Sequence, residues 1–335
     1  MLIGAFAVGS DSGNVYVRSR HSLAAENLAI ALAKARDYGI LGKDVLGSEF
    51  DFDITFSCDS GVPVCDEFGA GDINSPSRPF EYSAGEGYRK SGHVLADDVE
   101  TWANVPIVFS EGRRWYPGMG TGNSEDTKIF SLGGATQNTG LVEVPRGTSL
   151  REVIFDIGGG ARHGKGLRAV HTGGPFGSFI PPSETNVELD FESLAELGSS
   201  PGSGTIAVLD EGNCMVDMTQ YFVEFLTDRL CGKCTGCPPG LSNIAEILGR
   251  FTKGQGKEED ISVLEQLATA IKAGSPCETG ANAANTVLSS LRYFRDEYQA
   301  HVRNRRCPAG VCKSLISFAI DPEKCHGCQE CADEC

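Results

Sequence analysis

Residues 231–237 read Cys231-Gly-Lys-Cys234-Thr-Gly-Cys237, and a fourth cysteine follows in the loop Gly274-Ser-Pro-Cys277. Three closely spaced cysteines and one remote cysteine are the ligand set of a [4Fe–4S] cluster. Four thiolates also bind zinc, but the compact triplet favours the iron–sulfur cube. Four unrelated core thiols are a weaker explanation. The stretch therefore predicts a cluster bound by Cys231, Cys234, Cys237 and Cys277.

The chain around these cysteines has the periodicity of amphipathic helices. Apolar residues recur at helical spacing in four segments, which are Tyr221–Leu226, Ile244–Phe251, Ile261–Ile271 and Leu288–Tyr298. Four such segments with short connections indicate a helical bundle. We therefore predict a four-helix bundle that carries the cluster, over residues 206–306.

A second cysteine run closes the sequence, Cys325-His-Gly-Cys328-Gln-Glu-Cys331-Ala-Asp-Glu-Cys335. Its CxxCxxCxxxC spacing is that of bacterial ferredoxins and predicts a second [4Fe–4S] cluster. Residues 307–335 are too few to form a core without such a cluster. In two-cluster ferredoxins the fourth cysteine binds the other cluster, so either the protein continues or the fourth ligand comes from elsewhere. Cys335 stays a candidate.

Cys214, His301, Cys307 and Cys312 form a further candidate set. Three cysteines and one histidine suit tetrahedral zinc. Two alternatives stay open. Cys214 could be a small buried side chain while His301 caps the last bundle helix, or Cys307 or Cys312 could bind the C-terminal cluster.

Length, charge and cysteine content exclude some classes of function and favour others. The 335 residues exceed what one hydrophobic core usually serves, and the net charge of −16 argues against nucleic-acid binding. No apolar run has the length of a membrane span. The N-terminus has no basic region or cleavage site, so we expect a cytoplasmic protein, in which thirteen cysteines favour metal binding over disulfides. Two of them, Cys58 and Cys65, are expected to be buried or free thiols.

The N-terminal part has an α/β pattern. A strand at Asn14–Arg18, a helix with Ser22 as N-cap and Gly39 as its stop, and an alternating strand at Phe50–Phe56 predict a parallel crossover unit. Residues 57–125 show little periodicity. We expect a partial Rossmann-like domain over residues 1–122.

The middle part is expected to be a compact mixed domain over residues 123–205. Three short strands, Lys128–Leu132, Gly140–Val144 and Leu167–Val170, surround one helix, Ser149–Asp156. The glycine clusters at 158–160 and 173–174 are interpreted as turns, because a dinucleotide fingerprint needs a strand, a turn and a helix. The fold class is thus α+β and multidomain.

Several motifs resemble those of the flavin- and NADH-binding subunits of respiratory complex I and their relatives, and the resemblance covers most of the chain. They are Val99-Glu-Thr-Trp-Ala-Asn-Val-Pro106, Thr139-Gly-Leu-Val-Glu-Val-Pro145, Asp156-Ile-Gly-Gly-Gly160, Thr172-Gly-Gly-Pro175 and Cys231-Gly-Lys-Cys234-Thr. Cys307-Pro-Ala-Gly-Val-Cys312-Lys resembles the ferredoxin-bearing branch, found in soluble NADH-linked hydrogenases and formate dehydrogenases.

This resemblance has several implications. It implies that residues 123–205 form a β-grasp, soluble-ligand-binding-like domain and that residues 307–335 form a ferredoxin-like segment. The first cluster would accept electrons from a flavin, and the Cys/His set would bind zinc. The expected partners are a thioredoxin-like [2Fe–2S] subunit and a hydrogenase- or formate dehydrogenase-type subunit.

The chain also departs from the family at its flavin site. The family's glycine-rich loop lies upstream of anything present in this sequence. Cys65-Asp-Glu-Phe-Gly69 stands where the family has Cys-Gly-Glu-Glu-Thr, and Asp97-Asp98-Val99-Glu100-Thr101 stands for Asn-Asn-Val-Glu-Thr. Carboxylates in place of amides remove donors near a flavin phosphate. Glu67 and Glu100 would therefore bind FMN or NAD only if the site is live.

Three hypotheses follow. The first is an electron relay with two [4Fe–4S] clusters, a zinc ion, no catalytic residue and a degraded flavin site. The alternative is an NADH:acceptor oxidoreductase that uses FMN, with its N-terminal half supplied elsewhere. The third is a structural subunit with zinc and no working cluster, which the two complete cysteine runs disfavour.

Overall fold

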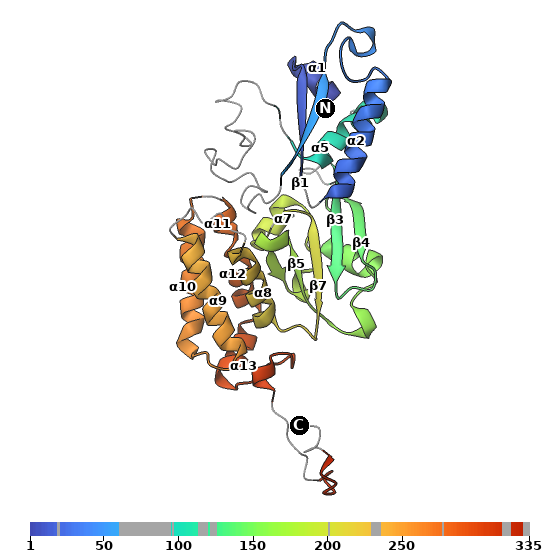
Figure 1. Cartoon of the computed structure of the whole chain (residues 1–335). Coiled ribbons are helices and arrows are strands. Elements are labelled where there is room, and N and C mark those ends of the chain that lie inside the picture. Colours follow the sequence, from blue (N-terminus) through green and yellow to red (C-terminus); the bar gives the residue numbers. More distant parts are fainter. Residues whose placement is uncertain are drawn as a thin grey trace.

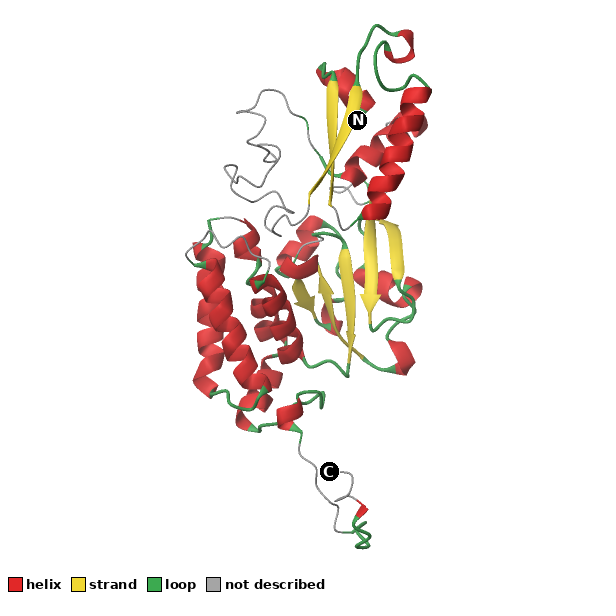
Figure 2. Ribbon diagram, in the orientation of Figure 1, coloured by secondary structure: helices red, strands yellow, loops and turns green. Residues whose placement is uncertain are grey.

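The computed structural model describes residues 1–18, 21–59, 95, 97–112, 120, 126–199, 202–228, 236–276, 278–316 and 323–330. They form a mixed helix and sheet structure (Figure 1). A small N-terminal unit lies at one end, a five-stranded sheet follows, and helices are gathered beside that sheet rather than between its strands (Figure 2).

The N-terminal unit contains α1 (Leu2–Val8), β1 (Ser12–Arg18), α2 (Ser22–Asp37), the short turn η1 (Val45–Gly47), β2 (Asp53–Asp59) and α5 (Val99–Glu111). β1 and β2 pair in parallel, as the sequence predicts. The predicted N-cap is wrong by one residue, because His21 is the N-cap and Ser22 is the first helical residue. The predicted stop is confirmed, since Gly39 has a φ of 67°. Of the predicted strand at 50–56, Phe52 forms only an isolated bridge with Gly42, so β2 begins later.

The five-stranded sheet has the order β4-β3-β7-β5-β6. The three predicted strands are confirmed as β3 (Thr127–Gly134), β4 (Gly140–Pro145) and β5 (Leu167–Thr172), while β6 (Ser178–Ile180) and β7 (Thr205–Asp210) were not predicted. β7 is central, parallel to β3 and antiparallel to β5. The sheet therefore extends past residue 205, where the sequence analysis expected a boundary.

Short helices cover the connections of this sheet. Ser149 caps α6 (Leu150–Glu152), and its hydroxyl and the Glu152 carboxylate form a capping box. A π-helical turn, η3 (Val153–Ile157), continues the predicted helix into a glycine turn, where Gly159 and Gly160 have φ values of 73° and 76°. The remaining short elements are η4 (Arg162–Gly164), η5 (Gly174–Phe176), η6 (Pro182–Glu184) and α7 (Phe191–Glu196).

The helical part consists of α8 (Met215–Thr227), α9 (Cys237–Thr252), α10 (Glu258–Gly274), α11 (Glu278–Asn282), α12 (Asn285–Tyr293) and α13 (Arg295–Arg303), and the short turn η7 (Lys313–Leu315) follows. All four predicted amphipathic segments lie in helices, and each contributes residues to one core. Phe222 and Phe294 pack instead in a second core shared with the sheet, and Tyr221 is exposed. The fourth segment is two helices, because the chain leaves the helical conformation at Phe294 (φ −129°, ψ 27°).

The helices and the sheet share a buried contact. His171 of β5 stacks on Phe222 of α8 with ring centroids 4.0 Å apart. The backbone N–H of Phe179 in β6 donates to the Ser289 hydroxyl of α12 at 3.0 Å. These contacts hold β5 against α8 and β6 against α12.

Candidate metal centres

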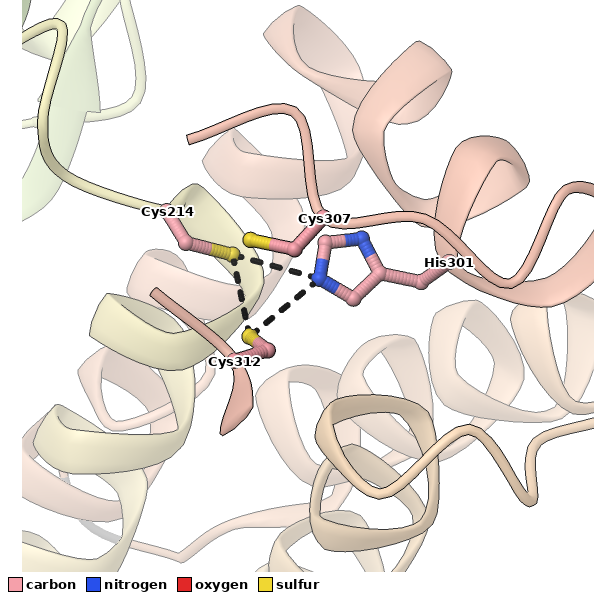
Figure 3. Close-up of side chains that lie close together, drawn as sticks. All are labelled: Cys214, His301, Cys307 and Cys312. Atoms are coloured by element: carbon pink, nitrogen blue, oxygen red, sulfur yellow. Dashed lines mark hydrogen bonds between the residues drawn. The ribbon is translucent and has the colours of Figure 1, made fainter. Parts of the chain in front are cut away.

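Four side chains from distant parts of the sequence converge at one point: Cys214, His301, Cys307 and Cys312 (Figure 3). Their ligand atoms all lie within 4.8 Å of one another, and all four residues are buried. The Sγ atoms of Cys214 and Cys312 are 3.8 Å apart, too far for a disulfide of about 2.05 Å. Two thiolates at about 2.3 Å from one tetrahedral zinc ion would be separated by about 3.8 Å. The group can therefore hold a metal ion.

Three elements deliver these ligands. Cys214 follows β7 and is the N-cap residue of α8. His301 lies in the last turn of α13. Cys307 and Cys312 lie in the loop after α13, where Gly310 takes a φ of 69° and donates its N–H to the Cys307 carbonyl at 3.0 Å. The group thus ties the end of the sheet, one helix N-terminus and one loop together.

The His301 ring is oriented as a metal ligand would be. Its Nδ1 lies 2.8 Å from the Glu297 carbonyl oxygen, which can only accept, so Nδ1 carries the proton. The other nitrogen, Nε2, then presents its lone pair, and it lies 3.4 Å from Sγ of both Cys214 and Cys312. A backbone carbonyl that fixes the tautomer in this way is the usual support of a ligating histidine.

Glu297 supports the group through contacts with residues next to the ligands, and it was not predicted from the sequence. Its side chain is 1% exposed, pairs with Arg168 of β5, and accepts the Met215 N–H at 3.0 Å. Because Met215 follows Cys214, this carboxylate holds the N-terminus of α8 against α13. The available signal was its spacing, since Glu297 lies one helical turn before His301.

The surroundings of Cys214 disfavour a free thiolate there. A hydrogen bond with Cys312, together with burial, raises the pKa of the Cys214 thiol above its ordinary value. Burial acts against protonation of His301, but the Cys214 thiol and the Glu297 carbonyl outweigh it and raise the pKa of His301. A bound cation is what would stabilise thiolates here, with release of their protons.

The first predicted cluster is represented by one described ligand, Cys237. It is the first residue of α9 and is 5% exposed. The N-terminus of a helix stabilises a thiolate. Gly280 of α11 faces it, because a Cβ atom at this glycine would lie 3.5 Å from the Cys237 Sγ. A buried thiol at a helix N-terminus fits a cluster ligand. Cys231, Cys234 and Cys277 lie outside the described residues.

The second predicted cluster is described at two positions. Cys325 and Cys328 are exposed within residues 323–330, whereas Cys331 and Cys335 lie outside the described residues. Among the residues that the structure describes, only the group around His301 brings three or more potential metal ligands together. The ferredoxin-like cluster therefore stays a prediction from spacing.

At the expected flavin site, Glu67 and Cys65 lie outside the described residues, and Glu100 lies in the first turn of α5. The Glu100 carboxylate accepts the Ile129 N–H at 2.8 Å and pairs with Lys128 of β3. The Asp98 carboxylate accepts the Thr101 N–H at 2.7 Å and caps α5. Both acidic groups thus hold α5 in place. Of Cys58, only its place in β2 is described.

Comparison with known proteins now adds to this geometry. The family model described as the NADH-ubiquinone oxidoreductase-F iron–sulfur binding region matches residues 217–301, which include the first four predicted cluster ligands. HndC, part of the NADP-reducing hydrogenase of Solidesulfovibrio fructosivorans, is 43% identical over 341 residues, covering 100% of this chain and 69% of HndC. The F component of the NADH-quinone oxidoreductase of Escherichia coli is 32% identical over 313 residues, covering 90% of this chain and 69% of the relative. The chain belongs to the family that these two proteins share.

A solved structure agrees with this family membership. The crystal structure of an NAD⁺-reducing [NiFe]-hydrogenase in the H2-reduced state matches with a TM-score of 0.75 and 27% identity. The match covers 90% of this chain and 51% of that chain, so this chain spans about half the length of the hydrogenase chain.

The predicted family is thereby confirmed. The protein is an iron–sulfur-binding subunit of the NADH-dehydrogenase family, and its relatives are subunits of larger oxidoreductases. Among the described helices, none combines the length and apolar character that crossing a bilayer requires.

Proposed function

We propose that this chain is an electron relay in a multi-subunit oxidoreductase of the NADH-dehydrogenase family, of the hydrogenase or formate dehydrogenase type. The observation that carries the proposal is the buried Cys237 at the N-terminus of α9, inside the matched iron–sulfur region. A [4Fe–4S] cluster supplies one-electron transfer. Cys231, Cys234, Cys237 and Cys277 would hold one cluster, and Cys325, Cys328, Cys331 and Cys335 are the candidates for the second.

We further propose that the chain's own flavin site is degraded. Asp97 and Asp98 stand where the family has amides, and Asp98 serves as the N-cap of α5. Glu100, the described candidate for flavin or NADH binding, is already engaged by Lys128 and the Ile129 N–H. An acidic, internally paired segment offers few donors to a phosphate. The alternative is an NADH:acceptor oxidoreductase in which Glu67 and Glu100 line a live FMN site.

The Cys/His group is proposed to bind structural zinc. A closed set of four protein ligands with no open position is typical of structural rather than catalytic zinc. Cys214, His301, Cys307 and Cys312 would hold the ion, and Glu297 would orient two of them. In the assembly, the proposed neighbours are a thioredoxin-like [2Fe–2S] subunit and a hydrogenase- or formate dehydrogenase-type subunit.

The domain division is part of the same proposal. A partial Rossmann-like domain (1–122) and a β-grasp domain (123–205) would precede the helical bundle (206–306) and the ferredoxin-like segment (307–335). The N-terminal parallel strand pair and the separate helical core agree with this division. The place of β7 suggests moving the second boundary to the end of this strand, at Asp210.

The decisive experiment is a cofactor inventory of the full chain, purified anaerobically without other flavin-bearing subunits. We expect iron and sulfide but no FMN released on denaturation, and we expect Cys237→Ala to lose one cluster's share of iron. Near-stoichiometric FMN would contradict the relay and support the NADH-oxidising alternative. A folded chain without iron would support the third hypothesis, a structural zinc subunit.

A further inference from the structure

The hydroxyl group of Ser275 is buried and has no partner among the described residues. Its Oγ has almost no contact with solvent and forms no hydrogen bond there. An unsatisfied buried donor is costly, so its presence needs an explanation. The Ser275 backbone is fixed, because its N–H donates to the Ile271 carbonyl at 3.0 Å and ends α10.

This hydroxyl and the Cys237 thiol pack against the same glycine, Gly280. A Cβ atom built at Gly280 would lie 2.9 Å from the Ser275 Oγ and 3.5 Å from the Cys237 Sγ. The two polar atoms therefore flank one point beside Gly280, where the closeness of Ser275 leaves no room for a Cβ atom. The point lies where the N-terminus of α9, the C-terminus of α10 and α11 meet.

A hydrogen-bond donor near this point would stabilise the negative charge of a cluster bound there. Reduction adds one negative charge to a [4Fe–4S] cluster, and hydrogen bonds to its sulfur atoms stabilise the reduced form more than the oxidised form. A hydroxyl in a buried site acts strongly because the surrounding dielectric constant is low.

We propose that the Ser275 hydroxyl donates a hydrogen bond to a sulfur atom of the [4Fe–4S] cluster held by Cys237 and raises its reduction potential. This inference rests on the proposed function, because it needs the cluster. Ser275 is a positioning and tuning residue and not a ligand. It makes the cluster a better acceptor of electrons from a donor subunit.

The test is a redox titration of the full chain, purified anaerobically and followed by electron paramagnetic resonance. The signal of this cluster is assigned by its loss in Cys237→Ala. We expect Ser275→Ala to bind the wild-type amount of iron and to titrate at a more negative potential. Ser242→Ala is the matched control, because this exposed hydroxyl on α9 donates to the Pro238 carbonyl and should leave the potential unchanged.

A second pair of variants separates the effect of the hydroxyl on the reduction potential from the effect of side-chain shape. Ser275→Thr keeps the hydroxyl, and Ser275→Val replaces it with a methyl group of similar size. We expect the threonine variant to titrate at a higher potential than the valine variant.

Two results would overturn the inference. One is an equal potential in wild type and Ser275→Ala at equal iron content. The other is loss of the cluster in the alanine and valine variants with retention in the threonine variant, which would assign Ser275 to assembly instead of tuning. A wild-type chain without any signal that depends on Cys237 would contradict the proposed function itself.

Discussion

At the residue scale, Glu297 joins three parts of the molecule through one carboxylate. It pairs with Arg168, accepts the Met215 N–H at 3.0 Å, and lies one turn before His301. We expect Glu297→Gln to weaken zinc binding about 10-fold, as changes behind metal ligands commonly do. Competition against a chromophoric chelator measures this affinity.

Glu265→Gln is the control for this prediction, because Glu265 forms an exposed ion pair with Arg295 that includes none of the ligands. It should leave zinc affinity unchanged. An unchanged affinity in Glu297→Gln would show that the Nδ1 bond to the backbone carbonyl is sufficient support.

His171 makes the stability of the contact between sheet and helices depend on pH. It is 1% exposed, and burial lowers its pKa to about 3, whereas an unfolded chain has about 6.5. Below pH 6.5 the unfolded state binds the proton and the folded state does not. This part of the free energy of unfolding is therefore fully present above pH 6.5 and falls by about 1.4 kcal/mol per pH unit below it.

We expect His171→Phe, which keeps the stack on Phe222, to lose this dependence. The difference in unfolding free energy between wild type and variant should change by about 1.4 kcal/mol between pH 7.5 and 5.5. Denaturation curves of both proteins at both pH values measure it, and the acid sensitivity of the metal centres cancels in the comparison. A constant difference would mean that His171 titrates normally in the folded protein.

At the element scale, the pairing of β3 with β7 depends on one of two adjacent glycines. Gly134 has a φ of 84°, and a Cβ atom there would lie 2.3 Å from the Val208 carbonyl oxygen. Gly133 has no heavy atom near its Cβ position. We expect Gly134→Ala to lower the free energy of unfolding by roughly 3 kcal/mol or more, and Gly133→Ala by at most about 1 kcal/mol. Equal effects in denaturant unfolding would show that the β3–β7 pairing adjusts to the added methyl group.

Several elements could be predicted from local pattern, and others could not. The segments with helical periodicity and the three short strands of the middle part agree with the structure. β7 was missed because Thr205–Asp210 is short and almost wholly apolar, as central strands are, so it has no alternation to recognise. The break at Phe294 was missed because the apolar spacing continues through α12 and α13.

At the scale of the whole molecule, the metal centres should be independent, because no predicted ligand is shared. We expect Cys307→Ala to lose zinc and keep iron, and Cys237→Ala to lose one cluster's share of iron and keep zinc. Cys328→Ala should lose the iron of the other, C-terminal cluster. The double variant should therefore retain zinc alone. Metal analysis of the purified variants measures this.

Loss of zinc from Cys237→Ala would contradict this independence. It would mean that the helical core around Cys237 is needed to hold α8 and α13 together. The shared packing of α8, α9 and α13 in one core makes this the informative comparison.

The sequence by itself determined the family, the helical segments and the two cysteine runs. It could do so because ligands a few residues apart converge in almost any local fold, and because helical periodicity is a local property. It also proposed Cys214, His301, Cys307 and Cys312 as one set, while the identity of their metal stays a prediction.

Only the tertiary structure decided that these four side chains meet, since packing of β7, α8 and α13 sets their distances. It also placed Glu297 behind His301 and the Ser275 hydroxyl beside Cys237. No local pattern encodes these contacts, because each joins residues whose separation in space is fixed by the burial of a common core.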